Sequence, residues 1–176
     1  MWVDTHCHVY DPGEGNDTES VLHNAREENV SLMVCVGTCR ETSIRANEIA
    51  QANPDVFSTV GVHPHDAVDG TDSITDLIAR DKVVGIGECG LDYHYNHSPR
   101  DIQQRVFAEH IALAKQHELT LVVHTRDAWD DTFRILDECG APEHTVFHCF
   151  TGGPDQARAC LDRGGYLSFS GIITFK

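Results

Sequence analysis

The chain has 176 residues, of which 40 % are hydrophobic, and a formal net charge of −15 at pH 7. This length suits one domain with its own core, and no run of about 18 apolar residues is present to cross a membrane. The acid excess argues against tight binding of duplex DNA through a basic patch. It leaves open a nucleic-acid substrate at a metal site, where ions supply positive charge. The N-terminal segment lacks the basic and apolar regions of a signal peptide, so we expect a cytoplasmic protein.

Short apolar runs alternate with helical segments along the chain. The apolar runs are rich in Val, Ile, Leu and Phe, as strands buried on both faces are. We predict strands at 2–6, 31–37, 56–62, 83–87, 120–124, 145–148 and 166–170. Apolar residues at helical spacing predict helices at 18–29, 41–53, 72–80, 100–116, 128–139 and 154–163. Several of these segments end at Gly or before Pro, as helices often do.

This alternation is typical of βαβ units and a parallel sheet. A doubly wound open sheet and a (β/α)8 TIM barrel both fit the pattern. A complete barrel has about 250 residues. For residues 1–176 we therefore expect a single α/β domain, an incomplete barrel of seven strands and six helices.

Histidine or glutamate occurs at the carboxyl ends of several predicted strands. A lone histidine in such a place is more often a surface or hydrogen-bonded residue than a ligand. In a parallel α/β fold, however, these strand ends gather on one face, where ligands bind. His6 and His8 are separated by one residue, and the alternation of side chains along a strand places them on the same face. Together the set predicts a metal site formed by His6, His8, Glu88, His124 and His148.

The residue types indicate two divalent ions of Mg, Mn or Zn. Imidazoles suit Zn and Mn, and a carboxylate also suits Mg. The five ligands exceed what one tetrahedral ion needs, and Glu88 can bridge two ions. His63 and His65 follow the third predicted strand and could be outer ligands or substrate contacts. Arg126 could bind a phosphate through its planar guanidinium, or could pair with a neighbouring aspartate.

Short motifs mark these strand ends in a fixed order. They are DTHCH at 4–8, GVHPH at 61–65, GIGECGLDY at 85–93, HTRDA at 124–128, HCFTG at 148–152 and YLSFSG at 166–171. The set resembles the TatD family of metal-dependent deoxyribonucleases, which are amidohydrolase-like TIM barrels. The resemblance implies a nuclease that cleaves phosphodiester bonds with water activated by two metal ions. We expect DNA to be the main substrate.

The resemblance also implies a role for each ligand. His6 and His8 would hold the first ion, His124 and His148 would hold the second, and Glu88 would bridge both.

Further positions take substrate-side roles by the same resemblance. His63, His65 and Arg126 would position phosphates, and Asp92 would lie behind the ligands or beside the substrate. The family carries one more ligand, an aspartate on the eighth strand, which binds the first ion. The chain ends before that strand, so we expect a C-terminally truncated domain with little or no nuclease activity alone. The ion at the first two histidines would then be the more weakly held.

Three alternatives stay open. A related barrel hydrolase could act on another ester, an amide or a lactone, although many of those enzymes bridge their metals with a lysine, and neither Lys82 nor Lys115 ends a predicted strand. A catalytically inactive metal-binding protein would also carry these ligands. Redox sensing is the third alternative, through Cys7, Cys89 and Cys149. The oligomeric state is left open.

Overall fold

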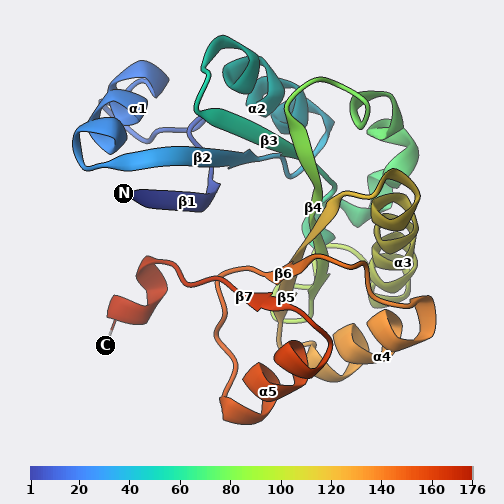
Figure 1. The fold of residues 1–176 in the computed structure, drawn as a ribbon. Coiled ribbons are helices and arrows are strands. Elements are labelled where there is room, and N and C mark those ends of the chain that lie inside the picture. The colour runs from blue at the N-terminus through green and yellow to red at the C-terminus, as the bar shows by residue number, and fades with distance from the viewer. Residues whose placement is uncertain (176) are drawn as a thin grey trace.

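The computed structural model describes residues 1–175, which form one curled sheet of seven parallel strands with helices on its outer face (Figure 1). The strands lie side by side in chain order, so each pairs with its neighbours in the sequence. Their bounds are β1 (Trp2–Cys7), β2 (Val30–Val36), β3 (Val56–Val60), β4 (Val83–Asp92), β5 (Thr120–Arg126), β6 (Thr145–Phe147) and β7 (Tyr166–Leu167). The predicted α/β class and the incomplete TIM barrel are confirmed.

Five α-helices connect the strands within the described residues: α1 (Thr18–Glu27), α2 (Arg40–Ala52), α3 (Arg100–His117), α4 (Trp129–Cys139) and α5 (Pro154–Asp162). Local chemistry sets their ends. The carboxylate of Asp17 accepts the backbone N–H of Ser20 at 2.8 Å and caps α1. Helix α3 ends where Glu118 takes a left-handed conformation. Among these 175 residues, no helix is long and apolar enough to cross a membrane.

The helix predicted at 72–80 is wrong. This segment forms only two short 3-10 turns, Thr71–Ser73 and Thr75–Leu77. The hydroxyls of Ser73 and Thr75 each donate to a backbone carbonyl three residues earlier. Such side-chain bonds compete with helical pairing. Ile74 and Leu77 are nevertheless fully buried, so the segment contributes to the core without being a helix.

Two central strands are longer than predicted, and the last strand is shorter. Strand β4 continues to Asp92 and β5 to Arg126, whereas β7 has only two residues. Gly90 and His124 are register partners in the β4–β5 pair. The longer β4 therefore includes Glu88 and Asp92, and the longer β5 includes Arg126. Backbone pairing between the two strands holds these residues in place.

Glycines let the central strands approach closely near the carboxyl end of the sheet. A Cβ on Gly61 would overlap the backbone of Gly87, and a Cβ on Gly90 would overlap the carbonyl oxygen of His124. Gly90 also has a φ of +136°, which residues with a side chain rarely adopt. The motif around Glu88 thus requires glycine for close packing as well as for backbone conformation.

The main apolar core lies between the sheet and helices α3 and α4, and a smaller cluster lies beneath α1 and α2. The two outer strands of the sheet are different. Large apolar side chains are exposed on and after them: Trp2, Val3, Tyr166, Phe169, Ile172, Ile173 and Phe175. The sheet is therefore well covered at its centre and bare along β1 and β7.

One polar residue of α3 is part of this core. His110 is fully buried, its Nε2 accepts the backbone N–H of Val62 at 3.0 Å, and its Nδ1 donates to the carbonyl of Val106 at 2.7 Å. Burial lowers the pKa of His110 to about 4. A neutral imidazole is needed here because a protonated Nε2 could not accept the Val62 bond.

We expect this histidine to make the fold sensitive to mild acid. Between its ordinary pKa of 6.5 and its folded value of about 4, the unfolded chain binds more protons. The free energy of unfolding therefore falls as the pH falls, by about 2 kcal/mol for His110 alone between pH 7 and pH 5. Denaturant titrations at both pH values should show a smaller drop for His110→Gln than for the parent chain. An equal drop in both proteins would contradict the assignment.

Candidate metal centre

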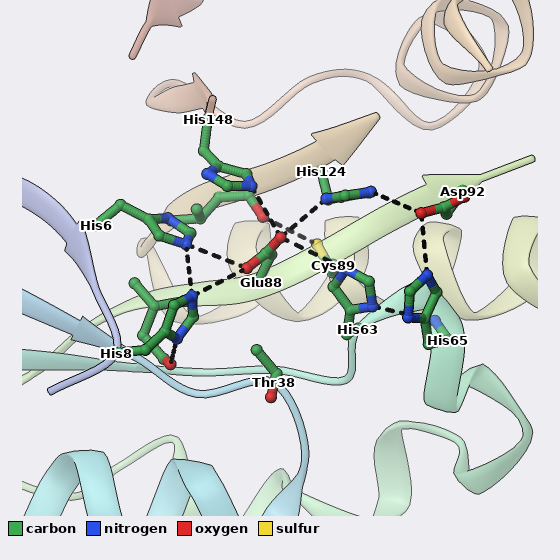
Figure 2. A network of polar contacts seen from close by, with 12 residues as sticks. His6, His8, Thr38, His63, His65, Glu88, Cys89, Asp92, His124 and His148 are labelled. Atoms are coloured by element: carbon green, nitrogen blue, oxygen red, sulfur yellow. Dashed lines mark hydrogen bonds and ion pairs between the residues drawn. The ribbon is translucent and has the colours of Figure 1, made fainter. Parts of the chain in front are cut away.

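The carboxylate of Glu88 lies at the centre of a group of histidines (Figure 2). Glu88 belongs to β4 and is 4 % exposed. Its Oε2 lies 3.1 Å from Nε2 of His6 and 3.9 Å from Nε2 of His8. Its Oε1 faces three other ring nitrogens: His63 Nε2 at 3.6 Å, His124 Nδ1 at 3.0 Å and His148 Nε2 at 2.8 Å.

Different strands deliver these side chains to one place. His6 lies in β1 and His8 directly follows it, His63 begins the turn after β3, His124 lies in β5, and His148 follows β6. The order of the parallel sheet brings the carboxyl ends of these strands to one side. The five predicted ligands are therefore brought together, and His63 and His65 lie beside them (Figure 2).

The donor atoms fall into two groups that share Glu88. Its carboxylate, His6 and His8 form the first group, and its carboxylate, His63 and His124 form the second, with ligand atoms within 4.8 Å of one another in each. His148 approaches the same oxygen as His124. The sequence predicts His63 as an outer ligand or a substrate contact, and the turn after β3 brings its Nε2 to 3.6 Å from Oε1 of Glu88. The coordination of His124 and His148 with a second ion stays a prediction.

The protonation states fit a metal site. Burial lowers the pKa of His6 and lowers that of His63 to about 3. Burial alone would raise the pKa of Glu88, but hydrogen bonds with His124, His148 and His6 outweigh it and hold that pKa well below its ordinary value. At neutral pH His6 and His63 are thus neutral and Glu88 is ionised, the forms that bind metal. The ring nitrogens of His6 and His8 are 3.3 Å apart, and a cation would satisfy both lone pairs.

A family model described as TatD related DNase matches residues 3–176. The chain belongs to the TatD-related DNase family. It is 44 % identical over 181 residues to the uncharacterized metal-dependent hydrolase YabD of Bacillus subtilis, covering all of this chain and 71 % of that protein. It is 35 % identical to the 3′-5′ ssDNA/RNA exonuclease TatD of Salmonella typhimurium, over 89 % of this chain and 62 % of that protein.

Solved structures agree with this membership. YjjV, a TatD homologue from Escherichia coli, superposes with a TM-score of 0.91 at 28 % identity, over 99 % of this chain and 70 % of that one. An uncharacterized amidohydrolase from Saccharomyces cerevisiae shares the fold, with a TM-score of 0.79 at 19 % identity. The predicted family is thus confirmed, and with it the class of metal-dependent hydrolases.

Residues behind the candidate ligands orient their imidazole rings in this TatD-family protein. Nδ1 of His8 lies 3.0 Å from the carbonyl of Val36 and 2.8 Å from the hydroxyl of Tyr10, which itself donates to Val36. A proton on Nδ1 leaves the Nε2 lone pair for the site. Sequence reasoning missed Tyr10, although its place two residues after His8 was a signal. Nδ1 of His6, by contrast, is buried without a partner among residues 1–175.

Asp92 is shared between two histidines. Its Oδ2 lies 3.0 Å from Nε2 of His65 and 3.3 Å from Nε2 of His124, and its side chain is almost fully buried. Burial alone would raise the pKa of Asp92, but a bond from the N–H of Tyr95 and the contact with His65 leave it lowered. The two ring nitrogens of His124 thus face two carboxylates, Nε2 toward Asp92 and Nδ1 toward Glu88, and Asp92 fixes the orientation of the ring.

Replacing Asp92 with Asn is expected to weaken metal binding by about 10–100-fold, because the orienting charge behind His124 is lost. Isothermal titration with Mn²⁺ or Zn²⁺ measures this effect. Asp127→Asn is the matched control, since Asp127 pairs with His94 at 3.1 Å on the exposed rim. Equal affinities for Asp92→Asn and the parent chain would show that Asp92 does not support the ligand.

A cavity of about 570 Å³ opens beside Glu88 and is lined by the side chains of His63, His65 and Arg126, among others. Among the described residues, Arg126 makes no ion pair and no side-chain hydrogen bond, so the predicted alternative of a salt bridge is not realised. The neighbouring Asp127 pairs instead with His94. The guanidinium is therefore available to an anion in the cavity.

Two of the three cysteines named for redox sensing, Cys7 and Cys89, do not favour that role. The Cys7 thiol donates to the carbonyl of Val34, away from Glu88, and the Cys35 thiol together with burial raises its pKa. Burial also raises the pKa of Cys89 well above the ordinary value. Reactive cysteines have lowered pKa values and some exposure. These two thiols are protonated side chains that fill space in the sheet.

Proposed function

We propose that this protein is a two-metal phosphodiesterase that acts on single-stranded nucleic acid, with DNA as the main substrate. The observation that carries the proposal is the position of Glu88, whose two carboxylate oxygens face separate groups of histidines. Such a carboxylate can bridge two divalent ions. The name of the Salmonella typhimurium relative, a single-stranded DNA and RNA exonuclease, supports the substrate class.

The residues around Glu88 suit this chemistry. Bound divalent ions would supply charge to the phosphoryl oxygens and a water of lowered pKa. His6, His8, Glu88, His124 and His148 would hold them, and His63 faces the same oxygen of Glu88 as His124. Arg126 would bind a substrate phosphate through its free guanidinium nitrogens. His65, fixed by Asp92, lines the same cavity and would orient the phosphate.

Hydrolysis of amides or lactones through a lysine bridge receives no support from the two described lysines. Nζ of Lys82 donates to the carbonyls of Asn53 and Val56, and Nζ of Lys115 donates to the carbonyl of Cys139 at 2.7 Å. Neither lysine lines the cavity beside Glu88. The bridging position belongs to a glutamate, which favours phosphoester cleavage.

A direct test incubates the purified chain with Mg²⁺, Mn²⁺ or Zn²⁺ and a single-stranded DNA labelled at its 5′ end. Duplex DNA, single-stranded RNA, a lactone and a dihydropyrimidine are assayed beside it. The proposal predicts metal-dependent shortening of the single strand, at a low rate because the eighth-strand aspartate is absent, and no turnover of the last two. Metal binding without any turnover would instead favour a non-catalytic metal-binding protein. Turnover of the lactone or the dihydropyrimidine alone would refute phosphodiesterase activity.

A further inference from the structure

Arg126 ends β5 at the mouth of the cavity and is exposed. In a chain with a net charge of −15, an arginine would ordinarily find a carboxylate. Its register partner and its chain neighbour are already engaged, since Asp92 contacts His65 and His124, and Asp127 contacts His94. The cationic head is thus kept free beside the metal ligands.

An aromatic ring holds this arginine instead. Cζ of Arg126 lies 4.8 Å from the centre of the Tyr95 ring, in the geometry of a cation–π contact. Tyr95 is 51 % exposed. Rings of His65, His94 and His97 stand beside it, with centre-to-centre distances of 5.5, 4.7 and 5.7 Å. The result is an aromatic rim next to a free guanidinium.

The rim is fixed to the metal centre through Asp92. Oδ1 of Asp92 accepts the backbone N–H of Tyr95 at 2.9 Å and that of His94 at 3.0 Å. The other oxygen of the same carboxylate contacts His124. The side-chain amide of Asn96 closes the loop by donating to the carbonyl of Tyr93. The Tyr95 ring therefore keeps a defined position relative to the ligands of Glu88.

We propose that Arg126 and Tyr95 form a nucleotide subsite for a single strand, an inference that rests on the proposed function. Arg126 binds the phosphate of the nucleotide next to the cleaved bond. The base of that nucleotide stacks on the exposed surface of the Tyr95 ring. Aromatic rings and arginine planes are the usual stacking partners of unpaired bases. Bases within a duplex are already paired and stacked, so this subsite selects single strands. Tyr95 also positions Arg126 by holding its guanidinium.

The test measures binding apart from cleavage. A fluorescein-labelled single-stranded dodecathymidylate is titrated with the protein in EDTA at low salt, and fluorescence anisotropy gives Kd. Tyr95→Ala and Arg126→Ala are each expected to raise Kd about tenfold, whereas Tyr95→Phe keeps the ring and stays within about twofold. Arg126→Ala should also reduce the magnitude of the slope of log K against log salt concentration by about 0.7, because one phosphate contact is lost. Tyr95→Ala should reduce that slope by less, because the charge of Arg126 remains.

The matched control is Arg100→Ala. Arg100 is an exposed arginine over the Tyr93 ring at 4.2 Å, and it does not line the cavity. Equal weakening by Tyr95→Ala and Arg100→Ala, unchanged binding in Tyr95→Ala, a duplex bound as tightly as the single strand, or no binding at all would each overturn the subsite. If the expected pattern appears but metal-loaded protein cleaves no nucleic acid, the subsite stands and the proposed phosphodiesterase activity fails.

Discussion

Replacing Glu88 with Gln is expected to lower metal-dependent hydrolysis about a thousandfold, equivalent to about 4 kcal/mol of transition-state stabilisation. The amide keeps the size of the side chain but removes the charge that two groups of histidines share. Its NH2 group would replace one of the two oxygens, and would face either Nε2 of His6, now 3.1 Å from Oε2, or Nε2 of His148, now 2.8 Å from Oε1. Both groups therefore lose a ligand through a single substitution.

The rate on single-stranded DNA and the metal stoichiometry from calorimetry together test this prediction. Glu143→Gln is the matched control, because Glu143 is an exposed glutamate in the loop before β6 and takes no part in the site. Retention of more than about a tenth of the parent activity in Glu88→Gln would contradict a bridging role, since a tenfold loss corresponds to only about 1.4 kcal/mol.

Replacing Gly90 with Ala is expected to lower the free energy of unfolding by more than about 3 kcal/mol. Two effects combine at this position. The backbone φ of +136° strains a residue with a Cβ, and the added methyl would overlap the carbonyl oxygen of His124 on the adjacent strand. Relief would require β4 and β5 to separate at the place where they carry Glu88 and His124.

Urea denaturation measures this loss of stability. Gly164→Ala is the comparison variant, because it adds a Cβ at a positive φ without a steric overlap. Gly164 has a φ of +74° but open space around the position of a Cβ, so strain alone should cost about 1 kcal/mol. The difference between the two variants reports the overlap with His124 together with the greater strain of a φ of +136°. If both substitutions cost the same, the close approach of β4 and β5 does not matter for stability.

The parts of the site that depend on topology alone could be predicted from the sequence. His6, His8, Glu88, His124 and His148 gather because parallel strands in chain order present their carboxyl ends to one side, whatever their lengths. That inference needs only the alternation of strands and helices and the residue type at each strand end.

The contacts that depend on loop paths and on strand lengths could not be predicted. His63 reaches Glu88 because a short 3-10 turn begins at Pro64, and no periodicity encodes the direction of that turn. Asp92 joins two histidines because β4 runs beyond its predicted end at 87. His110 did carry a signal, since it falls four residues after Val106 on the apolar face of α3, but its partner Val62 is distant in the sequence.

The place of each ligand in the sheet has a consequence for how the two groups become ordered. Glu88 and His124 lie on β4 and β5, which have a strand on either side, whereas β1, which carries His6, is the first strand in the sheet order and pairs only with β2. Nδ1 of His6 also lacks a partner among the described residues. An element held on one side retains more conformational entropy than one held on both. Within residues 1–175, an ion at His6 and His8 would therefore have to order a strand held on one side, whereas Glu88 and His124 are held by strands on both sides.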